Sequence, residues 1–340
     1  MLTESEGGFL MPAGLTPEGL VYSENYADTM NREVLPWLKS QEKALTVRGA
    51  GNRPIAAFRY DAADPRGTAV ILHGFTECAA KFSELTCSLL HNRWSVLTCD
   101  QRGHGASWRD ERITDLSLTH VDSFQEYVDD LRALCDQALK QMPRPWVIFA
   151  HSMGGAVTCA FLEDHPGVFE KAVLCAPMIA PNRGGMSLTL GKLLCRGAKL
   201  IGKGRERIFI SKPFDGPEAF ETSNATGRER FDWYDSLRVS TEKYHNNGPT
   251  WSWTLEAFSV TRRLLAPGKP EGVTIPVMLY SAETDGSVLP EPQAEIVSRL
   301  PKGQRKTVPG SKHEIYRSPD DVLFPWWREI LDFLGTPAQA

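Results

Sequence analysis

The chain has 340 residues and a formal net charge of −4, from 38 basic and 42 acidic side chains. This balance offers no broad basic field to a nucleic acid, so a nucleic-acid partner is not expected. The length exceeds what one ordinary domain needs, which predicts one domain with a sizeable insertion, or two domains.

The cysteines and the N-terminal segment indicate the compartment. The seven cysteines are scattered and include no C-x-x-C pair, so we expect neither a disulfide framework nor a zinc site. The first basic residue is Arg32, and no apolar run is long enough to span a bilayer. These features predict a cytoplasmic protein without a signal peptide or a transmembrane helix. Residues 1–22 carry no clear period and are predicted to form a loosely ordered leader.

Apolar runs typical of buried strands alternate with segments of helical spacing, first up to residue 177 and again from residue 277. The predicted strands are 55–60, 68–72, 94–99, 146–150, 171–175, 277–280 and 306–308, and the predicted helices are 81–91, 124–139, 154–162, 292–300 and 322–334. This order predicts an α/β protein with a mostly parallel sheet and helices on both faces. The core is expected from residues 23–177 and 263–340, and residues 178–262 are expected to form an inserted cap.

Ser152 lies between a predicted strand and a predicted helix. It directly follows the strand 146–150 and is followed by Met153 and Gly154. A serine on such a sharp turn is typical of a nucleophile elbow, in which the next N–H, here that of Met153, points at the developing oxyanion. Gly154 matches the second glycine of the G-x-S-x-G pattern. Ala150 occupies the position of the first glycine, so the chain departs from the pattern there. The alternative is a serine that only caps a helix.

A nucleophilic serine needs a base and a group that orients the base. In this class of sheet the acid and then the histidine follow the serine, each on a loop after a strand. His313 is the only histidine after the insertion and follows the last predicted strand, while Asp285 follows the strand 277–280. The alternatives are a surface-loop histidine and an ordinary turn aspartate, with Glu283 as a rival acid.

The turn after the first buried strand is the expected source of a second oxyanion donor. His73, Gly74 and Phe75 close that strand, and we predict that the N–H groups of Phe75 and Met153 form the oxyanion hole. Three histidines precede the nucleophile or adjoin it within turn motifs, and a structural hydrogen-bonding role is predicted for them: His73, His104 and His151.

Four motifs in fixed order resemble the α/β-hydrolase family: H-G-F-T-E, D-Q-R-G-H-G-A-S, H-S-M-G-G and G-S-K-H-E. Within it they are similar to the monoacylglycerol lipase and bacterial lysophospholipase branch. The resemblance extends from about residue 55 to 334 and includes N-N-G-P-T-W-S-W in the cap. It implies a catalytic triad of Ser152, Asp285 and His313, with no metal or organic cofactor.

The same resemblance implies a serine hydrolase that cleaves the carboxylic ester of a lysophospholipid or a monoacylglycerol through an acyl-enzyme. Two alternatives remain open. One is an esterase or acyltransferase acting on smaller, non-lipid esters. The other is a binding protein on a hydrolase fold that has lost its chemistry.

The cap contains a basic amphipathic pattern. Between residues 186 and 201 apolar side chains recur near helical spacing, and a second stripe consists of Lys192, Arg196, Lys199 and Lys203. The pattern suits an anionic lipid surface or a phosphate head group, so we expect peripheral contact with the inner face of a membrane through the cap. The alternative is a cap helix packed on the core with its lysines in water.

The aromatic residues Trp251, Trp253 and Phe258 of the cap are predicted to line a substrate-binding pocket for the acyl chain. Simple packing is the alternative explanation for such buried aromatic side chains. The sequence leaves the oligomeric state open.

Overall fold

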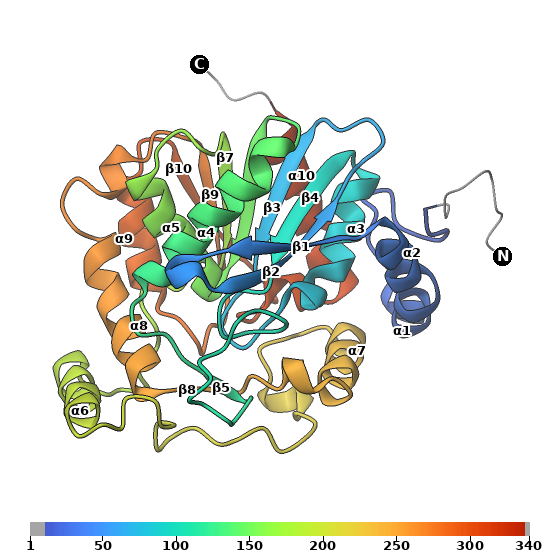
Figure 1. Ribbon diagram of the computed structural model, residues 1–340. Helices are drawn as coiled ribbons and strands as arrows, with labels where there is room; N and C mark the ends of the chain where they lie inside the picture. Colours follow the sequence, from blue (N-terminus) through green and yellow to red (C-terminus); the bar gives the residue numbers. More distant parts are fainter. Residues whose placement is uncertain (1–10, 337–340) are drawn as a thin grey trace.

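A single eight-stranded sheet forms the centre of the computed structural model, which describes residues 11–336 (Figure 1). Its strands, in spatial order, are β1 (Lys43–Arg48), β2 (Pro54–Tyr60), β4 (Trp94–Cys99), β3 (Gly67–Leu72), β6 (Trp146–His151), β7 (Lys171–Cys175), β9 (Val277–Ala282) and β10 (Gly303–Val308). Strand β2 is antiparallel to β1 and β4, and the remaining pairs are parallel. The predicted α/β class with a mostly parallel sheet is confirmed.

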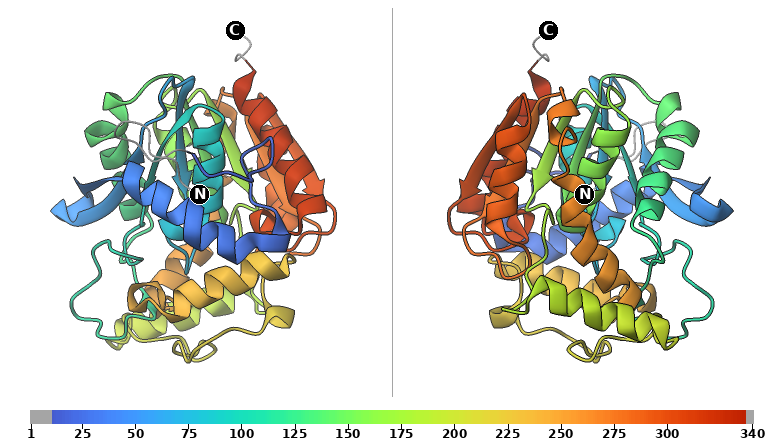
Figure 2. Two further views of the ribbon diagram at one scale, coloured as in Figure 1. Left: turned by 90° about the vertical axis from the view of Figure 1, so that its right-hand side faces the viewer. Right: turned by 90° about the vertical axis from the view of Figure 1, so that its left-hand side faces the viewer.

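Helices cover both faces of the sheet (Figure 2). One face packs against α4 (Gln125–Gln137), α5 (Ser152–Asp164) and α9 (Pro290–Arg299). The other packs against α1 (Tyr26–Thr29), α2 (Leu35–Gln41), α3 (Ser83–His91) and α10 (Asp320–Gly335). Strands β3, β4, β6, β7 and β9 are therefore buried along their whole length, which explains their continuous apolar sequences.

The segment expected to be a loosely ordered leader is packed wherever it is described. Leu20 and Val21 are buried. The N–H of Val21 donates to Glu84 and its carbonyl accepts from Arg230, which ties this backbone to two buried side chains. The expectation was therefore wrong for these residues, because their partners lie far away in the sequence. Residues 1–10 lie outside the described residues.

Residues 178–262 gather at the end of the sheet where the parallel strands terminate (Figure 1). They include α6 (Leu188–Leu200), α7 (Arg228–Val239) and β8 (Gly248–Pro249), which pairs with β5 (Leu118–Thr119). Helix α8 (Trp251–Leu264) crosses the expected boundary at residue 262 and packs into the core cluster of one sheet face. Within residues 11–336 no helix is both long and apolar enough to cross a bilayer.

Candidate active site

Ser152 sits on a strained turn between β6 and α5. Its φ angle is +49°, a conformation that residues other than glycine rarely adopt outside functional sites. The turn is this tight because α5 starts directly against the neighbouring strand end. A Cβ atom at Gly154 would lie 2.5 Å from the carbonyl oxygens of both Leu72 and His73. Only glycine fits there, and the geometry is that of a nucleophile elbow.

The alanine at the first small position of the elbow fits the same turn. Ala150 is fully buried in β6, where it pairs with Leu72 of β3 and Leu174 of β7. The carbonyl of Ser152 accepts a hydrogen bond from the N–H of Met178, at 2.8 Å. This hydrogen bond, from the segment that follows β7, fixes the turn. The methyl group that Ala150 adds, compared with glycine, is accommodated inside the sheet.

Ser152, His313 and Asp285 form one continuous chain of hydrogen bonds. The Nε2 atom of His313 lies 2.9 Å from Ser152 Oγ, and its Nδ1 atom lies 2.8 Å from Asp285 Oδ2. The other oxygen of Asp285 accepts the N–H groups of Ser287, at 2.8 Å, and Val288, at 3.0 Å. The three side chains that the sequence placed on separate loops therefore meet at the carboxyl end of β6, in the arrangement that activates a hydroxyl for nucleophilic attack.

The environment keeps Asp285 ionised. Burial alone would raise the pKa of this carboxyl, but the hydrogen bond and charge of His313, with the two backbone N–H donors, outweigh it and lower the pKa. Glu283 does not share this role: its carboxylate accepts the N–H of Gly310, at 2.9 Å. In the structure the group that orients His313 is Asp285, and not its rival.

The turn that contains Phe75 is held on both sides. The N–H of Gly74 donates to Glu77 at 2.5 Å, and the N–H of Thr76 donates to His104 Nε2 at 3.2 Å. Thr76 has a φ of +60°, so this turn is strained as well. The N–H of Phe75 lies between two anchored neighbours, which fixes its direction.

This turn comes close to Ser152. A Cβ atom at Gly74 would lie 2.9 Å from Ser152 Cβ, so Phe75 is only one residue removed from direct contact with the serine. Met153 is in the first turn of α5, where N–H groups have no acceptor within the helix. The two N–H groups predicted for the oxyanion hole therefore come from two segments near Ser152, the turn after β3 and the first turn of α5.

Two of the three histidines predicted to have a structural role bind backbone atoms of the surrounding turns. His73 accepts the N–H of Gln101 through Nε2, at 2.8 Å, and bonds the carbonyl of Gly74 through Nδ1, at 2.7 Å. His104 bonds the carbonyl of Arg102, at 3.0 Å. Burial lowers the pKa of both imidazoles. These contacts agree with the structural role predicted for the two side chains.

His151 belongs to a buried charge network that sequence reasoning missed. Its Nδ1 atom lies 2.8 Å from Glu77 Oε2 and its Nε2 atom 3.1 Å from the carbonyl oxygen of His313. With Glu77 ionised, both partners are acceptors, and these contacts favour the form of the ring in which both nitrogens donate, the imidazolium. Burial would lower the pKa of His151, but the charge of Glu77 outweighs it and raises the pKa.

The network continues from Glu77 to the loop that carries His313. Glu77 Oε1 accepts Lys81 Nζ at 3.0 Å and the hydroxyl of Tyr316 at 2.5 Å, and Lys81 Nζ also lies 2.6 Å from Glu314. Burial alone would raise the pKa of Glu77, but His151 and Lys81 hold it well below its ordinary range. The network therefore ties the residue before Ser152 to the residues around His313.

The aromatic residues predicted for the acyl pocket separate into two places. The ring of Trp253 packs on Phe75, with centroids 4.0 Å apart, and its Nε1 donates to the hydroxyl of Tyr127. Trp251 and Phe258 instead line an apolar cavity of about 30 Å³ between α6 and α8. Trp253 thus borders the site, whereas the other two shape the interior of the cap.

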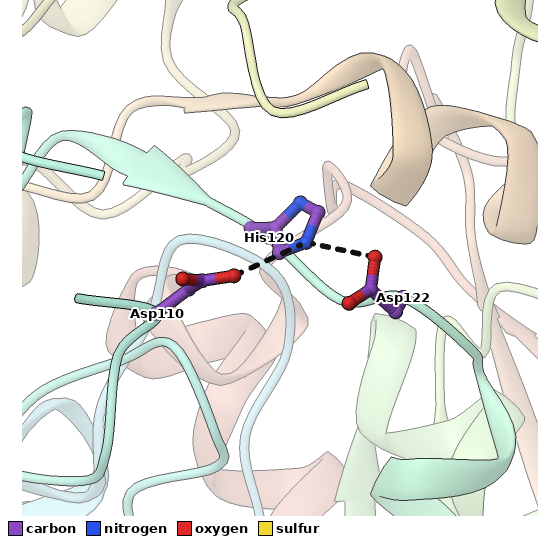
Figure 3. Close-up of side chains that lie close together, drawn as sticks. All are labelled: Asp110, His120 and Asp122. Atoms are coloured by element: carbon purple, nitrogen blue, oxygen red, sulfur yellow. Dashed lines mark ion pairs between the residues drawn. The ribbon is translucent and has the colours of Figure 1, made fainter. Parts of the chain in front are cut away.

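One group of possible metal ligands lies among the described residues, at Asp110, His120 and Asp122 (Figure 3), with ligand atoms within 4.8 Å of one another. Arg205 bonds both carboxylates, at 2.9 and 2.8 Å, and Arg112 bonds Asp110 at 2.6 Å. Guanidinium groups already occupy the positions beside these carboxylates, so we interpret the group as an ion-pair cluster that joins the cap to the loop after β4.

Comparisons with known proteins agree with this geometry. The family model described as serine aminopeptidase S33 matches residues 63–320. Lysophospholipase L2 of Escherichia coli K12 is 30% identical over 320 residues, covering 88% of each chain. Monoacylglycerol lipase of Mycolicibacterium smegmatis is 24% identical over 268 residues, covering 76% of this chain and 85% of the lipase.

Among solved structures, a soluble variant of monoglyceride lipase from Saccharomyces cerevisiae superposes with a TM-score of 0.66 at 16% identity, covering 86% of this chain and 95% of that one. The chain therefore belongs to the serine aminopeptidase S33 family of α/β-hydrolases, in the branch of the monoacylglycerol lipases and bacterial lysophospholipases. It is a carboxylic ester hydrolase.

Proposed function

We propose that this protein is a serine hydrolase that cleaves the single acyl ester of a lysophospholipid or a monoacylglycerol through an acyl-enzyme. The observation that carries the proposal is the unbroken hydrogen-bonded chain from Ser152 through His313 to Asp285 on a strained elbow. The activities named for the relatives in Escherichia coli and Mycolicibacterium smegmatis support the substrate class.

In the proposed reaction the same residues act twice, first when the acyl-enzyme forms and again when water cleaves it. His313 Nε2 takes the proton from Ser152 Oγ as the oxygen attacks the ester carbon, and Asp285 holds the imidazolium that results. The N–H groups of Phe75 and Met153 stabilise the oxyanion. His313 then gives its proton to the leaving glycerol oxygen. In the second half water attacks the acyl-enzyme, the fatty acid leaves, and Ser152 recovers its proton.

A substrate panel tests the proposal against its rivals. We expect the wild-type protein to hydrolyse a lysophospholipid or a monoacylglycerol with a higher kcat/KM than a short-chain ester, and a fluorophosphonate probe to label Ser152. Faster turnover of the short ester would favour a small-molecule esterase, and acyl transfer to an added alcohol in preference to water would favour an acyltransferase. A folded protein that the probe leaves unlabelled would support a non-catalytic binding protein.

We also propose peripheral membrane contact through the cap. Helix α6 packs on α8 through its small residues, since a Cβ atom at Gly191 would lie 2.7 Å from the ring of Phe258. Its leucines consequently face outward: Leu193 is 64% exposed and Leu200 87%. This exposure supports membrane contact over the alternative of a cap helix packed on the core with its lysines in water. Further exposed apolar residues follow at Ile201, Phe209 and Ile210.

The apolar surface lies beside the basic stripe of Lys192, Arg196, Lys199 and Lys203, which matches an anionic bilayer. We expect Leu200→Glu to weaken binding to phosphatidylglycerol-containing vesicles about tenfold or more, because a leucine inserted in lipid contributes roughly 1.5–3 kcal/mol. The measurement is vesicle co-sedimentation. Val239→Glu, at an exposed apolar position of α7, is the matched control, and equal losses in both variants would argue against the proposed contact.

A further inference from the structure

The imidazole of His104 connects the loop after β4 to the turn that carries Phe75. It is completely buried and lies edge-on to the ring of Phe75, with centroids 6.2 Å apart. Its Nε2 atom lies 3.2 Å from the backbone nitrogen of Thr76, whose N–H it accepts, and its Nδ1 atom lies 3.0 Å from the carbonyl oxygen of Arg102. His104 therefore joins the turn after β3 to a segment that comes 28 residues later.

These two contacts favour one form of the ring. A carbonyl oxygen only accepts, so Nδ1 carries a proton, and a backbone N–H only donates, so Nε2 carries none. His104 is therefore neutral in this arrangement. Burial, together with the edge-on ring of His73 and the cationic Arg109, lowers the pKa of His104 well below its ordinary 6.5, which agrees with the neutral form.

The loop that carries His104 holds the imidazole in place. The N–H of His104 donates to the carbonyl of Gln101, at 2.9 Å, and its own carbonyl accepts from Ser107, at 3.0 Å. The loop closes tightly at Gly105, which has a φ of +51° and where a Cβ atom would lie 2.0 Å from the carboxylate of Asp100. Nε2 is thus an acceptor with a fixed position.

The turn that receives this hydrogen bond is strained. The φ of Thr76 is +60°, a conformation that is a genuine outlier for a β-branched residue. Such a conformation persists only where the surrounding structure holds it. The peptide group with the N–H of Phe75 is the preceding one along the chain, so it loses its anchor on one side if Thr76 is released.

We propose that His104 is a positioning residue for the oxyanion hole, because its neutral Nε2 holds the N–H of Thr76 and so directs the N–H of Phe75 toward the oxyanion. The inference rests on the proposed function, which assigns Ser152 as the nucleophile and Phe75 as an oxyanion donor. His104 takes no part in the proton transfer. It affects the rate through the position of one donor, which has to lie about 2.7–3.1 Å from the oxyanion.

Two substitutions at this position each keep one of the two hydrogen bonds. Asparagine reaches the place of Nδ1 and can donate to Arg102, whereas glutamine reaches the place of Nε2 and can accept from Thr76. We expect His104→Asn to lower kcat for a short p-nitrophenyl ester about tenfold to a hundredfold, part of what an oxyanion donor contributes. KM should change less than about threefold, since the lost interaction belongs to the transition state. His104→Gln should recover most of the loss in kcat.

Thermal unfolding separates positioning from general damage to the fold. Both variants lose one buried hydrogen bond, so we expect similar decreases in Tm. His91→Asn, at an exposed histidine in the last turn of α3, should change neither kcat nor Tm. Equal kcat values for His104→Asn and His104→Gln would overturn the inference, because a purely structural role does not depend on which nitrogen is replaced.

The proton on His104 can also be located without turnover. In nitrogen NMR spectra of protein labelled at its histidines, we expect the signals that disappear in His104→Gln to show a protonated Nδ1 and an unprotonated Nε2 at neutral pH. A proton on Nε2 would overturn the inference whether or not any ester is hydrolysed. Failure to hydrolyse monoacyl lipids while the short ester is cleaved would count against the proposed function alone.

Discussion

We expect the replacement of Ser152 with alanine to lower kcat for ester hydrolysis by about a millionfold, the loss found when the serine of a catalytic triad is removed. The change removes the oxygen that lies 2.9 Å from His313 Nε2. It leaves the elbow intact, because the turn is fixed by the close approach of Gly154 to β3. The free energy of unfolding should change by no more than about 1 kcal/mol, the contribution of one hydrogen bond. Steady-state kinetics and thermal unfolding measure the two quantities.

Two acidic residues near His313 test which of them orients the imidazole. Asp285→Asn should lower kcat about ten-thousandfold, because an amide cannot hold the imidazole in the required tautomer. Glu283→Gln should have little effect on kcat, since Glu283 contacts the N–H of Gly310 and not His313. Substantial residual activity in Ser152→Ala, or a larger loss from Glu283→Gln than from Asp285→Asn, would show that the nucleophile or the acid has been assigned wrongly.

The parts of the fold that could be predicted are those encoded locally. Buried parallel strands are continuous apolar runs, and β4 and β7 have the predicted bounds of 94–99 and 171–175. Ser152 and Asp285 could be found because each follows such a strand, and His313 because it is the only histidine after the insertion and follows the last predicted strand, although β10 is mostly exposed. The order of these loops brings the three residues to one edge of the sheet. Strand β1 was missed because it is a mostly exposed edge strand without an apolar run.

Other features depend on contacts between distant residues. The spacing in α6 predicted its two stripes, but the close approach of Gly191 to Phe258 decides which side faces the core. The buried network could not be predicted because Glu77 and His151 are 74 residues apart and His151 resembles any histidine in a turn. The ion pair of Glu77 with Lys81, four residues later, gave no signal either, because Glu77 precedes the predicted helix 81–91 and the helical spacing argument does not reach it.

Glu77→Gln should produce the largest loss of stability, about 3–5 kcal/mol of unfolding free energy, because it leaves the charge of His151 buried without a carboxylate and leaves Lys81 with Glu314 as its remaining partner. Both side chains are at most 5% exposed, so water cannot take its place. The change also removes the reason for His151 to stay protonated. Its hydrogen bond to the carbonyl of His313 then weakens, and we expect kcat to fall up to about a hundredfold through misplacement of the imidazole.

The pH dependence of stability distinguishes loss of the ion pair from general damage to packing. The pKa of Glu77 is lowered from its ordinary 4.5, so its contribution is present above that pH and is lost as pH falls through the lowered value. The pKa of His151 is raised from 6.5, so its contribution is complete below that pH and is lost as pH rises through the raised value. The difference in stability between the wild-type protein and Glu77→Gln should therefore be greatest between pH 4.5 and 6.5.

Urea denaturation of the two proteins across pH 4 to 9 measures this difference. Glu111→Gln is the matched control, because Glu111 forms an ion pair with Arg53 in which its side chain is 68% exposed. Such exposed pairs contribute little to stability. A stability difference for Glu77→Gln that stays constant across the whole pH range would mean that Glu77 acts through packing, and that His151 is neutral in the native protein.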